Sequence, residues 1–418
     1  MTTQISFHTM RMLGIVFTLL LGIAALTSGC AEDPPPSLFD PDAAGGAKPI
    51  ISSIVSPTPN ALAGVTVVMI NGQNFSSIPQ NNLVFFDTLR ATVQNASATQ
   101  ISVLTPPVDN PRDSVNVKIA VLGAALFSDI YYLELVPPIT KPDSLALGEE
   151  PTGMTVDRFG NLYVSLLPSS AGPNVVQYTP SGVRTLYSPP FPSASRSYTG
   201  MKMGPGDTLY VAQRQARILR VFPGGGTAVT WIAGGGLGAI VDFDFDQQGN
   251  LWCGGSASSV YRVTPLKAIK AFPFVANVRS VRVYSGSLYV GGAMDSIEGV
   301  WRFPIVSADS LGPVQLFFNF TQAYPASGKV NAITFSNDGD MFVGVDEALS
   351  LILVHPNGSS ERFYPGLFKL QNTALAYGTT TELFASRRDT TAGSGPAHAI
   401  LRIETQKTTA PYYGRGDQ

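Results

Sequence analysis

The sequence predicts an all-β protein that consists of an N-terminal immunoglobulin-like β-sandwich followed by a six-bladed β-propeller. Short β-branched and aromatic segments, separated by turn residues, follow one another over residues 48–137. After residue 139, one short phrase recurs six times at a spacing near forty residues. The 41 glycines and 32 prolines are scattered along the 418 residues, which favours many turns over long helices.

The composition fits folded domains and gives no sign of a nucleic-acid partner. Apolar residues make up 44% of the chain, enough to build hydrophobic cores, and 418 residues are more than one core usually serves. Charged residues make up only 13%, and the net charge is −2 with no block of like charge. A basic patch that could track a phosphate backbone is therefore not expected.

Residues 1–29 have the layout of a secretory signal peptide. Arg11 is followed by an apolar run from Met12 to Leu26, which is short for a membrane-spanning helix, and then by small residues up to Cys30. This end resembles a bacterial lipobox, although Thr27 stands where that motif usually has an apolar residue. The resemblance implies that Cys30 is lipidated and becomes the mature N-terminus. The alternative is an ordinary signal peptide with an incidental cysteine.

The segment after the cysteine, residues 30–47, predicts a disordered tether. It is rich in proline, glycine and acidic residues and shows no apolar periodicity. We therefore expect a bacterial outer-membrane lipoprotein, with the membrane as a partner through the N-terminal lipid. The acidic residues after the cysteine resemble a surface-export signal, and the cell surface and the periplasmic face both remain open.

The first folded unit, residues 48–137, contains the short alternating segments of an immunoglobulin-like sandwich. Its residues 49–57 and 63–75 resemble an IPT/TIG domain, with the pattern P-x-I-x-x-I-x-x-P followed by V-x-I-x-G-x-N-F. Within that pattern, we expect Gly72 to supply the positive φ of a tight turn. The resemblance implies a spacer or binding module of the kind found in extracellular and regulatory proteins.

The second unit, residues 139–418, is a repeat. Each copy holds two turn residues, then Leu or Met, an aromatic residue and a small apolar residue that is usually Val. The copies lie at 160–164, 207–211, 249–253, 286–290, 339–343 and 381–385. A strand precedes and another follows most copies, which is typical of propeller blades. Residues 151–164 resemble the NHL repeat, and the unit also resembles gluconolactonase and regucalcin propellers. Residues 139–149 are candidates for a strand that closes the ring.

Six positions at the starts of the innermost strands are expected to face the central channel. Aligning the copies gives Thr152, Thr199, Val241, Arg279, Asn331 and Thr373. The resemblance to gluconolactonases implies Glu, Asn and Asp ligands for a divalent metal at such positions, but only Asn331 matches. Since hard cations need several oxygen ligands, usually with carboxylates, we expect no metal and no cofactor. Glu149 and Glu150 lie near enough in sequence to leave a degenerate site open.

The same ring offers candidates for ligand binding. Apart from Val241, its members carry hydroxyl, amide or guanidinium groups, so they would suit an anionic or neutral polar ligand, with Arg279 supplying charge. No catalytic residue is assigned. His355 and His398 are the only histidines after the predicted signal peptide, and both are expected near the rim or in loops.

These observations favour a non-catalytic binding or scaffold module for a glycan, peptide or envelope protein. The alternative is a lactonase-like propeller hydrolase or lyase that acts on sugar lactones or polysaccharide. A purely architectural role in an envelope complex is the third possibility. The absence of carboxylates from the six ring positions favours the binding module over the enzyme. The sequence does not distinguish the binding module from a purely architectural role.

Overall fold

The computed structural model of the chain describes residues 45–108, 114–142, 145–167, 172–191, 198–213, 215–325, 328–346, 351–367, 371–388 and 398–417, without the side chains of 371–373 and 388. The predicted signal peptide and Cys30 therefore lie outside the described residues. No helix within the described ranges is long and apolar enough to cross a membrane.

The first unit is a sandwich of two antiparallel four-stranded sheets. One sheet has the order β1-β3-β7-β6 and the other β5-β4-β8-β9, while β10 pairs with β2. The strands are β1 (Ile50–Val55), β2 (Ala61–Leu62), β3 (Val67–Gln73), β4 (Asn82–Phe86), β5 (Leu89–Arg90), β6 (Thr92–Ala96), β7 (Gln100–Leu104), β8 (Val115–Val121), β9 (Tyr131–Leu133) and β10 (Leu135–Val136), with a 3-10 turn η1 (Pro79–Asn81). Alternate residues of β3, β4 and β8 face inward and form one core, which includes Val68, Phe86 and Ile119.

Gly72 has a different role from the predicted one. It lies in β3, opposite a register shift in β1, and its φ is not positive. A Cβ on Gly72 would lie 1.9 Å from the carbonyl oxygen of Ile50, so the glycine is needed for the close approach of two strands. The left-handed conformation falls two residues later, on Asn74 with φ of 63°. The prediction of a positive φ at Gly72 was wrong. Glycine is favoured both in tight turns and where two strands approach closely, and the sequence alone does not tell these two reasons apart.

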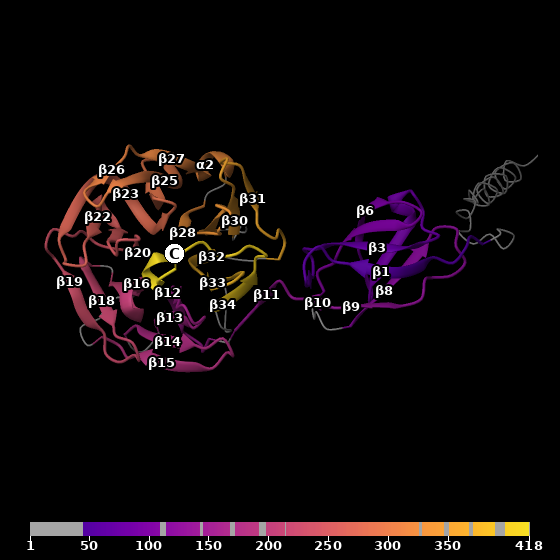
Figure 1. Cartoon of the computed structure of the whole chain (residues 1–418), viewed down its shortest axis with the longest axis horizontal. Helices are drawn as coiled ribbons and strands as arrows, with labels where there is room; N and C mark the ends of the chain where they lie inside the picture. The colour runs from indigo at the N-terminus through magenta and orange to yellow at the C-terminus, as the bar shows by residue number, and fades with distance from the viewer. Residues whose placement is uncertain are drawn as a thin grey trace, which may run out of the picture.

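The second unit is a propeller of six blades arranged around one axis (Figure 1). Blades 1 to 3 are β12 (Glu150–Val156), β13 (Leu162–Leu167), β14 (Asn174–Tyr178) and β15 (Arg184–Ser188); β16 (Tyr198–Gly204), β17 (Thr208–Gln213), β18 (Arg217–Val221) and β19 (Val229–Ala233); and β20 (Asp242–Phe245), β21 (Leu251–Gly254), β22 (Ser256–Val263) and β23 (Ile269–Tyr284). The predicted fold class, a sandwich followed by a six-bladed propeller, is confirmed.

The other three blades follow the same order, from the innermost strand outward. Blade 4 is the inner part of β23, then β24 (Ser287–Met294), β25 (Ile297–Ser307) and β27 (Gln315–Asn319), with β26 (Ser310–Leu311) beside β25; blade 5 is β28 (Val330–Phe335), β29 (Met341–Val345), β30 (Leu351–Val354) and β31 (Ser360–Arg362); and blade 6 is β32 (Gln371–Tyr377), β33 (Glu382–Arg388), β34 (His398–Glu404) and β11 (Ile139–Thr140). Helix α2 (Phe320–Ala323) and the 3-10 turns η2 (Pro205–Asp207) and η3 (Tyr413–Arg415) complete the unit.

The uneven spacing of the repeat has a structural cause. The single strand β23 is both the outermost strand of blade 3 and the innermost strand of blade 4, so no loop separates these blades. The repeat copies at 249–253 and 286–290 are therefore close in sequence. The next interval is long because blade 4 carries the extra strand β26 and helix α2.

The recurring phrase forms the turn between the first two strands of a blade. In blade 1, one carboxylate oxygen of Asp157 accepts hydrogen bonds from the backbone N–H groups of Phe159 and Asn161, both at 2.9 Å. Asp246 accepts equivalent bonds in blade 3, where its other oxygen also accepts from Trp252 Nε1 at 2.9 Å. The repeated aspartates therefore hold turns together, as aspartate commonly does.

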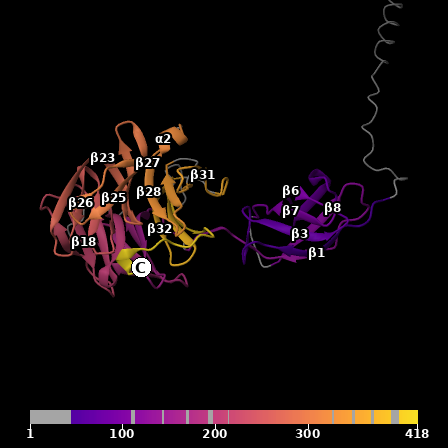
Figure 2. The same cartoon turned by 45° about the horizontal axis from the view of Figure 1, so that its top comes forward.

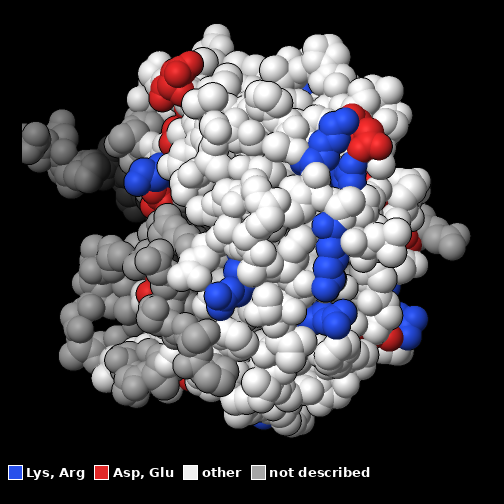
Figure 3. All heavy atoms as spheres, turned by 90° about the vertical axis from the view of Figure 1, so that its left-hand side faces the viewer, with Lys and Arg blue, Asp and Glu red and all other residues white. Residues whose placement is uncertain are grey.

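The propeller core lies between the blades. Six apolar clusters fill the six seams, and each takes residues from two neighbouring blades, as where Tyr163 and Val175 of blade 1 pack with Met201 and Leu209 of blade 2. The rim beside blades 2 and 3 is mostly uncharged (Figure 3), in keeping with the low content of charged residues.

The ring is closed by the strand that enters it. Strand β11 pairs with β34 of the last blade, so the first and last segments of the unit share one sheet. Only Pro137 and Pro138 separate β10 of the sandwich from β11, a short and stiff connection. The sandwich lies beside the rim of the ring, and the two views agree on this arrangement (Figures 1 and 2).

Candidate functional site

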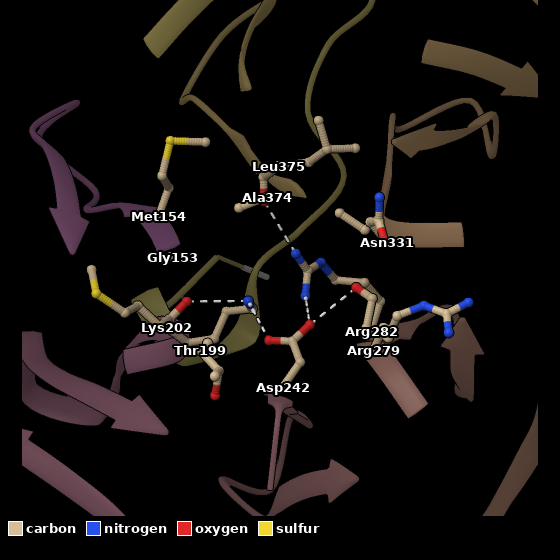
Figure 4. A pocket seen from close by; sticks show the side chains of 14 residues that line it. Gly153, Met154, Thr199, Lys202, Asp242, Arg279, Arg282, Asn331, Ala374 and Leu375 are labelled. Atoms are coloured by element: carbon tan, nitrogen blue, oxygen red, sulfur yellow. Dashed lines mark hydrogen bonds and ion pairs between the residues drawn. The ribbon is translucent and has the colours of Figure 1, made fainter. Parts of the chain in front are cut away.

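A polar cavity lies on the propeller axis, where the innermost strands of all six blades begin (Figure 4). The empty space between its walls is about 280 Å³ where open solvent is included, but the cavity is narrow and holds only one or two water molecules. The lining residues are Gly153, Met154, Thr199, Gly200, Met201, Lys202, Asp242, Arg279, Ser280, Arg282, Asn331, Ala332, Ala374 and Leu375.

The floor of the cavity is a buried cluster of charges from three neighbouring blades. Asp242 of β20 accepts from Lys202 Nζ of β16 at 3.2 Å and from Arg282 Nη1 of β23 at 3.0 Å. The same carboxylate also accepts from Ser280 Oγ at 3.0 Å and from the N–H of Val281 at 2.9 Å. The charged side chains are at most 8% exposed, so the cluster is fixed by partners rather than by solvent.

The two aspartates of β20 ionise differently. Burial alone would raise the pKa of Asp242, but the attraction of Lys202 and Arg282 and the backbone donors outweigh burial, so this pKa lies below its ordinary value. At Asp244 burial prevails over the same two cations, and the pKa is raised. Asp244 nevertheless accepts from the N–H of Val283 at 3.0 Å, so both aspartates join β20 to β23 across the seam between blades 3 and 4.

The C-terminal segment closes the channel from the opposite end. It runs from β34 back to the axis, where the chain ends at the centre of the ring (Figure 1). The ring of Tyr412 lies 6.0 Å from the guanidinium carbon of Arg282. Gly414 packs so closely on Met203 that a Cβ would lie 2.3 Å from its carbonyl oxygen. The cavity is therefore blind, with its opening on the side where the innermost strands begin.

Arg415 anchors this segment. Its buried guanidinium donates to the carbonyl oxygens of Tyr377 and Gly378 at 3.3 and 3.0 Å, and to Asp417 at 2.6 Å. The tripeptide from Arg415 to Asp417, which matches an adhesion motif in sequence, is thus engaged within the propeller itself.

The predicted ring positions coincide with a repeated distortion of the innermost strands. In five blades the innermost strand shifts register near its own start, where it pairs with the second strand. Each shift skips one of the predicted residues: Thr152, Thr199, Arg279, Asn331 and, together with Ala374, Thr373. Such bulges redirect a side chain out of the regular alternation. Blade 3 has no shift, because β20 begins at Asp242.

The structure places three of the six predicted residues in the cavity wall: Thr199, Arg279 and Asn331. Thr152 is not among the lining residues, and its hydroxyl forms a hydrogen bond with Ser165 Oγ at 3.0 Å. The side chain of Thr373 lies outside the described residues. Val241 does not line the cavity, and its neighbour Asp242 does.

Two expectations about charge in the channel need correction. Asp242 brings a carboxylate into the channel, which the six aligned positions did not include. Arg279 does not offer a free charge, because its guanidinium is paired with Glu298 and donates to the carbonyl oxygen of Val330 at 2.6 Å. The cations at the floor are Lys202 and Arg282, which the alignment missed because they lie three residues further along their strands.

The other candidates lie away from the cavity. His355 Nδ1 is 2.9 Å from Asp340, at the opposite end of blade 5, and His398 begins the third strand of blade 6. Glu149 is bound to Arg184 at 2.6 Å and does not line the cavity. In the part of the chain that the structure describes, no three His, Cys, Asp or Glu side chains gather as a metal site.

Comparisons with known proteins agree with this architecture. Residues 49–134 match the IPT/TIG domain family, and no curated protein sequence matches the chain. An auxiliary nutrient binding protein from Bacteroides thetaiotaomicron VPI-5482 has the same fold with a TM-score of 0.51 and 11% identity, over 87% of this chain and 98% of that protein. A protein assigned as a gluconolactonase gives a TM-score of 0.50 and 14% identity, over 65% of this chain and 93% of that one.

These matches confirm the two resemblances seen in the sequence at the level of fold. At such low identity the solved structures carry no information on ligand or reaction for this chain. Residues 49–134 therefore match the IPT/TIG domain family, and the propeller that follows shares its fold with these two solved structures.

Proposed function

We propose that this protein is a membrane-anchored lipoprotein of the cell envelope whose propeller binds a glycan, peptide or protein ligand without transforming it. The observation that carries the proposal is the blind polar cavity with its buried floor of Lys202, Asp242 and Arg282. Its polar groups are held in place before any ligand arrives, which lowers the entropic cost of binding.

The state of the charged groups favours binding over catalysis. A general base works best with a pKa near the working pH, whereas Asp242 has a lowered pKa and two cationic partners. Arg279 and Asn331 in the wall are bound to Glu298 and Asp346, so their positions are fixed.

The binding role is tested by screening the full-length protein against glycans and peptides, with a variant that fills the cavity mouth. Thr199→Trp should abolish any specific binding, because the indole would occupy the opening. Gln247→Ala, an exposed substitution at the other end of the propeller, should leave binding unchanged. Turnover of a sugar lactone or polysaccharide that is lost in Asn331→Ala would replace the binding role with an enzymatic one.

The anchoring part of the proposal depends on Cys30, whose position at the end of an apolar run supports lipidation. Cys30→Ser should move the protein from the membrane fraction to the soluble fraction. A variant that remains full length and membrane-bound would contradict lipid anchoring, and the binding screen would be unaffected by that result.

A further inference from the structure

Several N–H groups at the cavity floor have no acceptor within the described part of the chain. A guanidinium has five N–H groups and an ammonium has three. Arg282 uses Nη1 for Asp242 and the carbonyl oxygen of Val281, and Nη2 for that of Leu375 at 3.2 Å, while its buried Nε has no hydrogen-bond partner. Lys202 donates to Asp242 and to the carbonyl oxygen of Met201, which leaves one N–H.

The charges at the floor are not balanced one to one. Lys202 and Arg282 are both about 95% buried and share Asp242 as their ion-pair partner. The other carboxylate near these cations, Asp244, accepts from the backbone N–H groups of Phe245 and Val283, and burial raises its pKa. By contrast, Arg279 in the wall has Glu298 to itself. Because buried charges are stable only when they are paired, the floor favours the entry of one further negative charge.

The size and wall of the cavity narrow the choice of anion. The cavity as a whole has room for only one or two water molecules, which suits the two planar oxygens of a carboxylate better than a tetrahedral phosphate or sulfate. The hydroxyl of Thr199 in the wall donates to the carbonyl oxygen of Ala212 at 3.5 Å, which leaves its oxygen as an acceptor. The amide nitrogen of Asn331 is held by Asp346, so the amide oxygen can accept from a hydroxyl group. Figure 4 shows the guanidinium of Arg282 at the centre of this arrangement.

We propose that the cavity floor is a subsite for one carboxylate group, and that the propeller therefore prefers acidic sugars to their neutral counterparts. This inference rests on the binding role proposed above and adds the ligand class. The carboxylate would accept from Lys202 Nζ and from the unused edge of Arg282, while sugar hydroxyls would contact Thr199 and Asn331.

The test compares glucuronate, its methyl ester and glucose by calorimetric titration of the full-length protein. Glucuronate should bind at least about tenfold more tightly than the ester or glucose, since hydrogen bonds to a charged group are worth that much or more. The comparison uses the unaltered protein, so it does not depend on whether a variant folds. Equal affinities, or no glucuronate binding at about 10 mM, a concentration that detects even weak ligands, would overturn the carboxylate subsite.

A pair of lysine variants locates the effect. Lys202→Gln should weaken glucuronate binding about tenfold while Asp242 keeps Arg282 as its partner. The matched control is Lys407→Gln, because Lys407 also pairs with carboxylates, those of Asp338 and Asp340, but on the closed side of the propeller. Equal losses in both variants would overturn the assignment of the floor.

The failure of this inference is distinguishable from failure of the binding role. If neutral glycans bind at the mouth and are blocked by Thr199→Trp, while glucuronate and its ester bind equally, the binding role stands and the carboxylate subsite is wrong. If no ligand in the screen depends on Thr199, the binding role itself is wrong. Competition by sulfate as strong as by acetate would contradict the choice of carboxylate.

Discussion

Replacing Asp242 by asparagine should destabilise the propeller strongly, although the two side chains have nearly the same shape. The asparagine oxygen can still accept from Ser280 Oγ and the N–H of Val281. Its amide group, however, cannot neutralise Lys202 and Arg282, which lie at 3.2 and 3.0 Å and are buried. Removing one member of a buried ion pair costs about 3–5 kcal/mol.

That cost can be measured without interference from the sandwich. The three tryptophans, Trp231, Trp252 and Trp301, are all buried in the propeller, so tryptophan fluorescence follows this unit alone. For a unit of this size, the loss corresponds to a melting temperature about 6–20 °C lower.

The control is Asp207→Asn, which removes the exposed ion pair between Asp207 and Arg158 at 2.7 Å. Exposed pairs contribute about 1 kcal/mol or less, so the melting temperature should fall by at most a few degrees. If Asp242→Asn loses no more stability than Asp207→Asn, the floor is not held by its charges and the reasoning fails.

Three further predictions concern the cavity floor, the C-terminal segment and the sandwich. Because the pKa of Asp242 is lowered in the folded state, this carboxylate stabilises the fold above its ordinary pKa, and the stabilisation is lost as pH falls through the folded value. The pKa of Asp244 is raised, so this group lowers stability as pH rises above its ordinary pKa. Urea unfolding measured against pH should therefore show opposite changes in the pH dependence of the unfolding free energy for Asp242→Asn and Asp244→Asn. Arg415→Met should cost about 1.5–3 kcal/mol by tryptophan fluorescence, since it leaves two carbonyl groups without their donor, and no loss would contradict its anchoring role. Gly72→Ala should destabilise the sandwich by more than about 2 kcal/mol, because its Cβ would overlap the carbonyl oxygen of Ile50, whereas the tryptophan transition should stay unchanged.

The fold could be predicted because its signals are repeated and local. Each blade carries the same turn phrase, and Asp157 and Asp246 show why the phrase persists, since their carboxylates hold the turn by several hydrogen bonds. The ring-closing role of residues 139–149 remained only a candidate, because a two-residue strand such as β11 has no pattern of its own.

The site could be predicted only in part, because its geometry depends on strand register. The alignment placed Thr199 and Asn331 at the channel, and both are bulged positions in the structure, but a bulge sends neighbouring residues to different faces. Lys202 is the single charge of β16 and Arg282 is one of three in β23, and both are flanked by apolar residues, a signal that was available in the sequence. Their joint contact with Asp242 was not, since it needs the tertiary packing of three blades.

The position of a bound ligand tests the assignment of the channel most directly, in a crystal structure of the full-length protein with glucuronate or a ligand found by the screen. We expect ligand density on the axis, above Lys202 and Arg282 and between Thr199 and Asn331. Density in the groove on the closed side, lined by Gln248 and Tyr413, or only on the outer rim, would contradict the assignment of the channel mouth as the functional site.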